Sequence, residues 1–172
     1  MPKGNPTRLE FIRGLKYKLP TNAVVSIGSG CVIHETAVIG RDGFGYEPDE
    51  NCNLVKFPHF GNVQIGENVH IGAHTCIDRG AIEDTTIGDG TKIDNLVHIA
   101  HNCQIGRNVL IVAGAVIGGS TVIGDNTFIG INASIKEHLT IGKNCIIGMG
   151  AVVLNNTGDG ETWVGNPAKR IK

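Results

Sequence analysis

Residues 87–124 read IGDGTKIDNLVHIAHNCQIGRNVLIVAGAVIGGSTVIG, and this stretch decides the fold. An isoleucine recurs every six residues from Ile87, and the series continues as far as Val153. The position four residues after each of them carries a small side chain in nearly every repeat. A helix would repeat near 3.6 residues and a simple strand at 2, so a period of six excludes both. Three strand-and-turn units of six residues close a triangular coil of eighteen, and stacked coils pair as parallel strands.

The repeat also predicts the organisation of the chain. We expect an all-β solenoid over residues 21–158, an N-terminal cap over residues 1–20 and a C-terminal tail over residues 159–172. The register of the repeat breaks between residues 42 and 60, which we interpret as an external loop that holds four of the eight aromatic residues. Loops ejected from solenoids are frequently binding elements. Packing of these aromatic side chains on the solenoid wall or on a neighbouring subunit is an equally open interpretation.

Composition limits the classes of function. The formal net charge of -1 provides no basic surface for nucleic acid. The uncharged stretch over residues 109–124, one of the longest in the chain, is shorter than the roughly 20 residues of a membrane-spanning helix. Residues 1–20 lack the continuous apolar segment of a secretory signal, so we expect a soluble, cytoplasmic protein. The five cysteines form no CxxC pair, which predicts reduced thiols and no metal site.

A coil of eighteen residues brings chemically useful residues together. Gly119 follows His101 by eighteen residues and should lie one coil further along the axis, about 4.8 Å away. His138 should lie two coils further than His101 and one step around. A neutral histidine can take a proton from an attacking amine, and a glycine N–H can stabilise the oxyanion of the intermediate. This arrangement suits acyl transfer from a thioester to an amine, although a solvated surface histidine is an equally open interpretation of His101.

Five strings resemble a known family: IGRDGFGY at 39–46, IDRGA at 77–81, KIDN at 92–95, IAHN at 99–102 and SIKEHLTIG at 134–142. Together they resemble the hexapeptide-repeat acyltransferase superfamily, and within it the UDP-3-O-acylglucosamine N-acyltransferases of lipid A synthesis. The resemblance covers about residues 30–155. It implies a left-handed parallel β-helix and a homotrimer with active sites between subunits.

The resemblance also implies roles for individual residues. The histidine of IAHN, here His101, is the general base, and the glycine one coil later, here Gly119, contacts the oxyanion. His138 assists in substrate binding or catalysis. The further candidates are Asp94, Asn95 and Asn102 for the substrate and Ser120 for the donor. Lys169 and Arg170 are donor candidates through a second resemblance, that of the C-terminal tail, although a solvated basic terminus is an equally open interpretation.

Two features depart from this family. Its members carry an N-terminal domain that helps to grip the uracil nucleotide and a helical C-terminal extension, and we expect this chain to lack both. The chain ends VGNPAKRIK at residues 164–172, which resembles the tail of acetyl-coenzyme A-dependent sugar acetyltransferases. The donor therefore stays open between acyl carrier protein and coenzyme A, and no tightly bound cofactor is expected.

We predict an N-acyltransferase that moves an acyl group from a phosphopantetheine thioester to the amino group of a nucleotide-linked amino sugar, in lipid A-type or surface-polysaccharide synthesis. One alternative is an acetyl-coenzyme A-dependent sugar acetyltransferase. Another is a non-catalytic β-helix or a relative of the γ-type carbonic anhydrases, whose metal would need histidines that converge between subunits. The histidines available for that alternative are His70, His74, His98 and His101.

Overall fold

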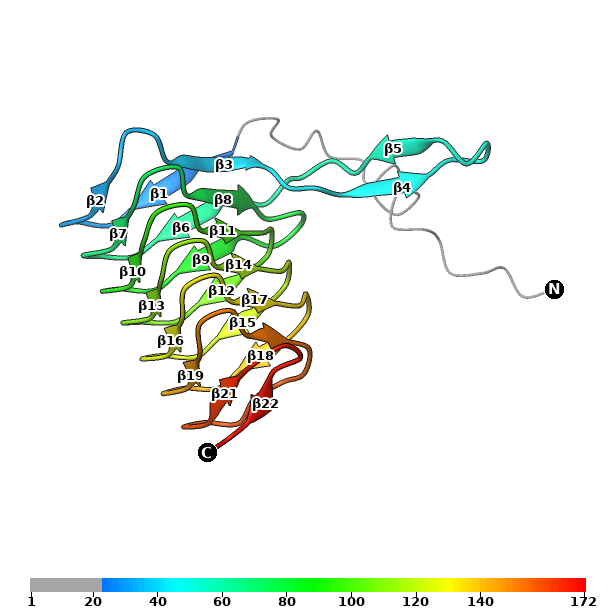
Figure 1. Ribbon diagram of the computed structural model, residues 1–172. Helices are drawn as coiled ribbons and strands as arrows, with labels where there is room; N and C mark the ends of the chain where they lie inside the picture. Colours follow the sequence, from blue (N-terminus) through cyan, green and yellow to red (C-terminus); the bar gives the residue numbers. More distant parts are fainter. Residues whose placement is uncertain (1–22) are drawn as a thin grey trace.

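The computed structural model describes residues 23–172, and the predicted N-terminal cap over residues 1–20 lies outside them. The described residues form strands and no helix, so none of them builds a helix that could cross a membrane. The strands wind into a left-handed parallel β-helix of about six turns, which confirms the predicted fold class (Figure 1).

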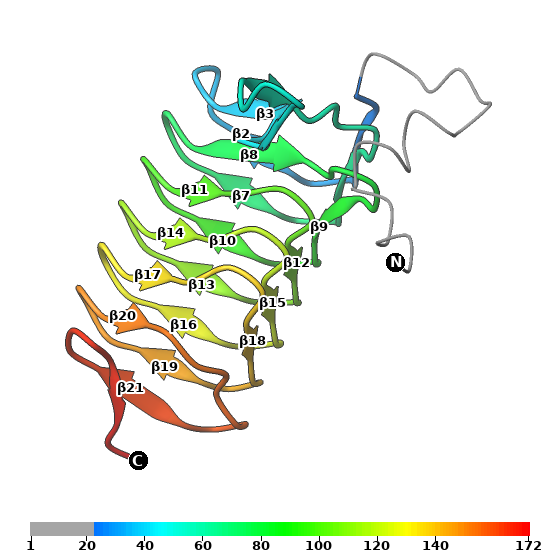
Figure 2. The same ribbon diagram turned by 90° about the vertical axis from the view of Figure 1, so that its right-hand side faces the viewer.

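Each coil contributes one short strand to each of three parallel sheets, called here sheets A, B and C (Figures 1 and 2). From β9 to β20 the partner residues in adjacent strands are eighteen apart, as in Ile93 beside Ile111 and Ile111 beside Ile129, so the predicted winding is present there. Sheet A contains β1 (Val25–Ile27), β6 (Val63–Ile65), β9 (Thr85–Ile87), β12 (Gln104–Ile105), β15 (Val122–Ile123) and β18 (Thr140–Ile141). Sheet B contains β2 (Val32–Ile33), β7 (His70–Ile71), β10 (Lys92–Ile93), β13 (Leu110–Ile111), β16 (Phe128–Ile129), β19 (Ile146–Ile147), β21 (Thr162–Val164) and β22 (Lys169–Arg170). Sheet C contains β3 (Val38–Asp42), β8 (Cys76–Arg79), β11 (His98–Ile99), β14 (Val116–Ile117), β17 (Ser134–Ile135) and β20 (Val152–Val153).

The core is a column of aliphatic side chains from the repeat position, and most of them are fully buried. Small residues fill the second inward position, where several threonines are buried as well. Their hydroxyls donate to carbonyls of the next coil, as Thr91 does to Gly106 at 2.9 Å and Thr127 to Gly142 at 2.8 Å. A buried hydroxyl needs such a partner, so the small position stabilises the stacking of the coils.

The corners of the solenoid explain another repeated feature. The third residue after the buried isoleucine adopts a left-handed backbone at most corners, with φ of 60° at Asn102, 58° at Ser120 and 60° at His138. Asparagine and glycine tolerate this region better than other residues. Three of the predicted site residues therefore occupy the strained position of a corner.

The break in the repeat forms a long connection from β3 to β6. The chain leaves sheet C after Asp42 and forms an antiparallel hairpin of β4 (Tyr46–Pro48) and β5 (Leu54–Lys56), which projects from one end of the solenoid (Figure 1). It then returns to the solenoid through Phe57 and His59, which are both buried. This connection spans the same corner, between sheets C and A, at which the other coils place their turns after β8, β11, β14 and β17.

The solenoid continues into the segment predicted as its tail. Strand β21 pairs in parallel with β19, with Trp163 beside Ile147, and adds one more rung to sheet B. Strand β22 then turns back antiparallel to β21, with Arg170 beside Trp163. The last rung of the solenoid thus lies beyond residue 158, because a strand can pair with the last coil without following the repeat.

Candidate functional site

The corner between sheets C and A gathers the predicted catalytic residues. His101 follows β11, Gly119 follows β14 and His138 follows β17, so successive coils stack them at the same corner. They border a cavity of about 270 Å³ on the solenoid wall. Its lining consists of Phe44, Asp78, His98, Ala100, His101, Gly118, Gly119, Glu137 and His138.

Gly119 lies directly against the ring of His101. A Cβ atom placed on Gly119 would be 2.8 Å from Cε1 and 2.9 Å from Nε2 of that imidazole. The backbone of Gly119 has an ordinary φ, so conformational freedom does not explain this glycine. Glycine is needed here because the imidazole occupies the space of a side chain.

At several other corners, the N–H group equivalent to that of Gly119 has a side-chain acceptor. Two residues after the buried isoleucine, the N–H of Glu67 donates to Asp89, that of Arg107 to Asp125 and that of Lys143 to Asp159, each a side chain of the following coil. The coil after Gly119 places Glu137 at the corresponding position. Within the described residues the N–H of Gly119 has no hydrogen-bond acceptor, so it is available to a ligand in the cavity.

His59 is the functional candidate that the sequence did not reveal. Its side chain is 4% exposed, and its ring lies 5.5 Å from that of His101, centroid to centroid, at an interplanar angle of 73°. Burial lowers the pKa of His59, so the ring is neutral at neutral pH. The only signal in the sequence was its place in the aromatic loop, because residues outside the repeat cannot be assigned to a corner by counting.

A carboxylate stands beside these histidines. Asp78, at the end of β8, has its Oδ2 atom 3.7 Å from Nε2 of His98, and its side chain is only 13% exposed. Burial raises the pKa of Asp78, while the neighbouring imidazoles of His98 and His101 oppose this shift when they are charged. His98 is 41% exposed, as expected of a surface histidine, and it also forms part of the cavity wall.

The predicted substrate-binding residues Asp94 and Asn95 lie at a different corner of the solenoid. They follow β10 and therefore occupy the corner between sheets B and C. The carboxylate of Asp94 accepts from the N–H of Asn95 at 2.7 Å, and the side chain of Asn95 accepts from the N–H of Ala73, also at 2.7 Å. Within a single chain these two residues hold coils together at a corner that His101 does not share.

The other predicted residues are divided between two places. Asn102 and Ser120 share the corner of His101, where the side chain of Asn102 accepts from the N–H of Ala81 and the N–H of Ser120 donates to the carbonyl of His101 at 2.9 Å. Lys169 and Arg170 lie on β22 at the C-terminal end of the solenoid. Neither basic residue borders the cavity of His101.

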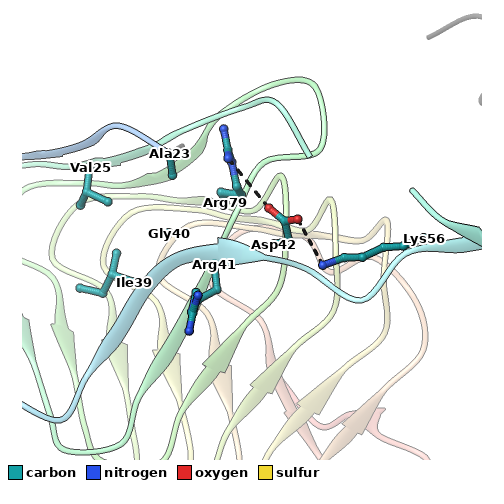
Figure 3. A pocket seen from close by; sticks show the side chains of 8 residues that line it. All are labelled: Ala23, Val25, Ile39, Gly40, Arg41, Asp42, Lys56 and Arg79. Carbon is teal, nitrogen blue, oxygen red and sulfur yellow. Dashed lines mark ion pairs between the residues drawn. The ribbon is translucent and has the colours of Figure 1, made fainter. Parts of the chain in front are cut away.

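A second cavity, of about 490 Å³, opens around the start of the loop, and Figure 3 shows the side chains that line it. The carboxylate of Asp42 pairs there with Nζ of Lys56 at 3.2 Å and with Nη1 of Arg79 at 3.9 Å. The buried Arg79 also donates from Nε to the carbonyl of Gly61 at 2.7 Å. These contacts fasten both ends of the loop to β8, and none of the predicted site residues lines this cavity.

The repeat region of the chain matches a known family model. Residues 84–119 and 120–155 each match the family described as "Bacterial transferase hexapeptide (six repeats)". The two matches together span residues 84–155, which carry His101, Gly119 and His138.

Similar proteins confirm the resemblance predicted from the motifs. UDP-3-O-acylglucosamine N-acyltransferase of Dechloromonas aromatica (strain RCB) is 64% identical over 74 residues, which cover 43% of this chain and 21% of that protein. Probable UDP-3-O-acylglucosamine N-acyltransferase 2, mitochondrial, of Arabidopsis thaliana is 58% identical over 82 residues, or 48% of this chain and 27% of that protein. The crystal structure of UDP-N-acetylglucosamine acyltransferase of Francisella novicida is 25% identical, covers 85% of this chain and 54% of that chain, and superimposes with a TM-score of 0.73. The matched segment spans about a quarter of the length of the curated relatives.

Proposed function

We propose that the protein is an N-acyltransferase that moves an acyl group from a phosphopantetheine thioester to the amino group of a nucleotide-linked amino sugar. One observation carries the proposal: the imidazole of His101 and the N–H of Gly119, which lacks an acceptor, border the same cavity. The relatives named UDP-3-O-acylglucosamine N-acyltransferase support the same reaction class.

The reaction assigns a task to each group. The amine nitrogen attacks the thioester carbonyl and forms the C–N bond, while its proton passes to His101. Nδ1 of His101 is buried, so Nε2 takes this proton. The N–H of Gly119 stabilises the oxyanion, an interaction typically worth about 3 kcal/mol. The C–S bond then breaks, and the thiolate takes the proton back from His101 and leaves as the thiol.

His138 and the donor residues complete the proposal. His138 borders the cavity two coils beyond His101 and positions the acceptor or its phosphates. Ser120 lies at the same corner, whereas Lys169 and Arg170 lie at the C-terminal end of the solenoid, where their charges suit the phosphates of a coenzyme A donor. Either acyl carrier protein or coenzyme A can supply the thioester in this scheme.

A homotrimer accounts for the distance between the predicted residues. Asp94 and Asn95 lie at the corner between sheets B and C, and His101 lies at the corner between sheets C and A. Residues at different corners of one solenoid can face each other only across an interface between neighbouring solenoids. We therefore assign Asp94 and Asn95 to the substrate bound at the His101 site of a neighbouring subunit.

The two alternative functions, a carbonic anhydrase relative and an acetyl-coenzyme A-dependent acetyltransferase, can be tested separately. A carbonic anhydrase relative would need a metal, and within one chain residues 23–172 contain no group of three His, Cys, Asp or Glu side chains that could hold one. Ligands would then have to converge from two chains, and a zinc assay of the purified protein tests this. An acetyl-coenzyme A-dependent sugar acetyltransferase differs only in its donor.

Product analysis tests the proposed reaction and separates the donors. The protein is incubated with a panel of UDP- and dTDP-linked amino sugars, each with acyl-acyl carrier protein or with acetyl-coenzyme A. Mass spectrometry should detect an amide product with at least one acceptor, and none with the matching sugars that carry a hydroxyl in place of the amine. If the whole panel gives no acylated product, the proposal is wrong.

A further inference from the structure

The loop between β3 and β6 places a second histidine, His59, next to the proposed base His101. His59 is 4% exposed and lies edge-to-face with His101, at a centroid distance of 5.5 Å. The same ring contacts Phe57 edge-to-face at 6.1 Å, so it is held from two sides. A cavity of about 80 Å³ separates this pair of histidines from Tyr46 and Glu47 of the hairpin.

Hydrogen bonding fixes the tautomer of His59. Its Nδ1 atom lies 3.0 Å from the carbonyl oxygen of Phe57. A carbonyl oxygen can only accept, so Nδ1 carries the hydrogen and donates it. Burial lowers the pKa of His59 and keeps the ring neutral, which leaves a lone pair on Nε2.

That lone pair is buried beside the ring of His101. Nε2 of His59 is inaccessible to solvent and has no hydrogen-bond partner among the described residues. A Cβ atom placed on Gly43 would be 3.0 Å from this Nε2, 3.1 Å from Cδ2 of His101 and 3.2 Å from Oδ2 of Asp78. The three groups therefore surround one point, which is unoccupied because Gly43 has no side chain.

This convergence has an electrostatic consequence. An imidazole that takes a proton spreads positive charge over its ring, including the carbon edge that contains Cδ2. A lone pair or a carboxylate near that edge stabilises the charge, and it does so more strongly in a buried site than in water. An apolar ring of the same size at position 59 would pack equally well but would lack this effect.

We propose that His59 is a positioning residue for His101: its ring holds the imidazole of His101 over Gly119, and its Nε2 lone pair stabilises the charge that His101 gains with the proton. The effect on catalysis rests on the proposed function, whereas the effect on the pKa of His101 concerns the unliganded protein. The other charged or titratable groups around His101 come from several elements: Asp42 of β3, Tyr46 and Glu47 of β4, Lys56 of β5, Asp78 of β8, His98 of β11, and Glu137 and His138 after β17.

Nuclear magnetic resonance titration of the histidines in the full chain tests the proposal without substrate. In the wild-type protein, His59 should stay in the neutral Nδ1–H tautomer while His101 titrates. In His59→Phe, which keeps an aromatic ring but has no lone pair, the pKa of His101 should fall by about half a unit or more. In His59→Gln, whose amide oxygen is an acceptor, it should stay near the wild-type value. The control Gln104→Phe, on the exposed face of sheet A, should leave the titration of His101 unchanged.

Kinetics provide the second measurement. In His59→Phe we expect kcat to fall about tenfold or more with KM nearly unchanged, and the acid limb of the pH profile to move with the pKa of His101. His59→Gln should recover most of kcat. An unchanged pKa of His101 in His59→Phe, or a wild-type His59 that carries its hydrogen on Nε2, would overturn the proposal. A wild-type protein that shows the predicted titration but no acyl transfer would instead overturn the proposed function.

Discussion

At the scale of single residues, the site depends on the absence of a Cβ atom at position 119. The imidazole of His101 occupies the place of a side chain on Gly119, and the same residue presents the N–H that lacks an acceptor. In Gly119→Ala the new methyl group would meet the ring at 2.8 Å, so the imidazole must move away. Displacing a reacting group by about 1 Å can cost about 100-fold in rate, and we expect a loss of that size in kcat.

The matched control for this substitution is Gly158→Ala at the C-terminal end. Its added methyl group would meet only the flexible carboxylate of Glu161, at 3.1 Å. Both variants should keep the circular dichroism spectrum of the wild-type protein, and only Gly119→Ala should lose acyl transfer. Full activity in Gly119→Ala would show that the ring of His101 does not need its observed place.

At the scale of the strands and turns, buried threonines join one coil to the next. Thr127 donates from its hydroxyl to Gly142 at 2.8 Å and accepts from the N–H of Cys145 at 3.1 Å. Thr127→Val keeps the shape but removes both hydrogen bonds, which should lower the free energy of unfolding by about 1–3 kcal/mol. Thr127→Ser keeps the hydroxyl and should lose less. Denaturant titration measures both, and equal losses would mean that the hydroxyl does not stabilise the stacking.

The same elements show how far the sequence could predict the structure. The six-residue spacing from Ile87 onward assigns each residue to a sheet or a corner, so His101, Gly119 and His138 could be placed together by counting. The position of His59 could not, because the hairpin follows no repeat and its path depends on the contacts of Asp42, Arg79 and Phe57. The repeat likewise does not predict strand β21, because its pairing with β19 is a tertiary contact without a repeat signal.

At the scale of the whole molecule, two buried groups make stability depend on pH. Burial places the pKa of His59 below its unfolded value of about 6.5, so the unfolded chain binds the proton first and stability falls as the pH drops through that value. Burial raises the pKa of Asp78, so its contribution has the opposite sign: stability increases as the pH falls through the folded pKa towards the unfolded value of about 3.9.

The contribution of His59 can be isolated by thermal unfolding at a series of pH values. Between about pH 8 and pH 6 the melting temperature of the wild-type protein should fall. In His59→Phe most of this decrease should disappear, because the side chain at position 59 can no longer take up a proton when the chain unfolds. Gln104→Phe, which changes an exposed residue of sheet A, should keep the decrease. The same slope in all three proteins would contradict the buried, neutral state of His59.

The proposed trimer has a testable surface. Leu110, Phe128 and Ile146 stack on neighbouring strands of sheet B, and these side chains are 48%, 38% and 49% exposed in the single chain. A continuous apolar stripe of this kind is typical of a contact between subunits. The double variant Leu110→Glu and Phe128→Glu should therefore sediment as a monomer, whereas Gln104→Glu on the exposed face of sheet A should keep the wild-type state. A monomeric wild-type protein, or a double variant that stays a trimer, would contradict this assignment.

The central claim is that His101 takes the proton of the attacking amine, and the most direct measurement is the turnover of His101→Ala with the acceptor and donor found active for the wild-type protein. Loss of a general base should reduce kcat by about 10² to 10⁴-fold. The melting temperature and the subunit number should stay close to those of the wild-type protein, since the ring supports no strand of the solenoid. Turnover at the wild-type rate in a folded His101→Ala protein would contradict the account.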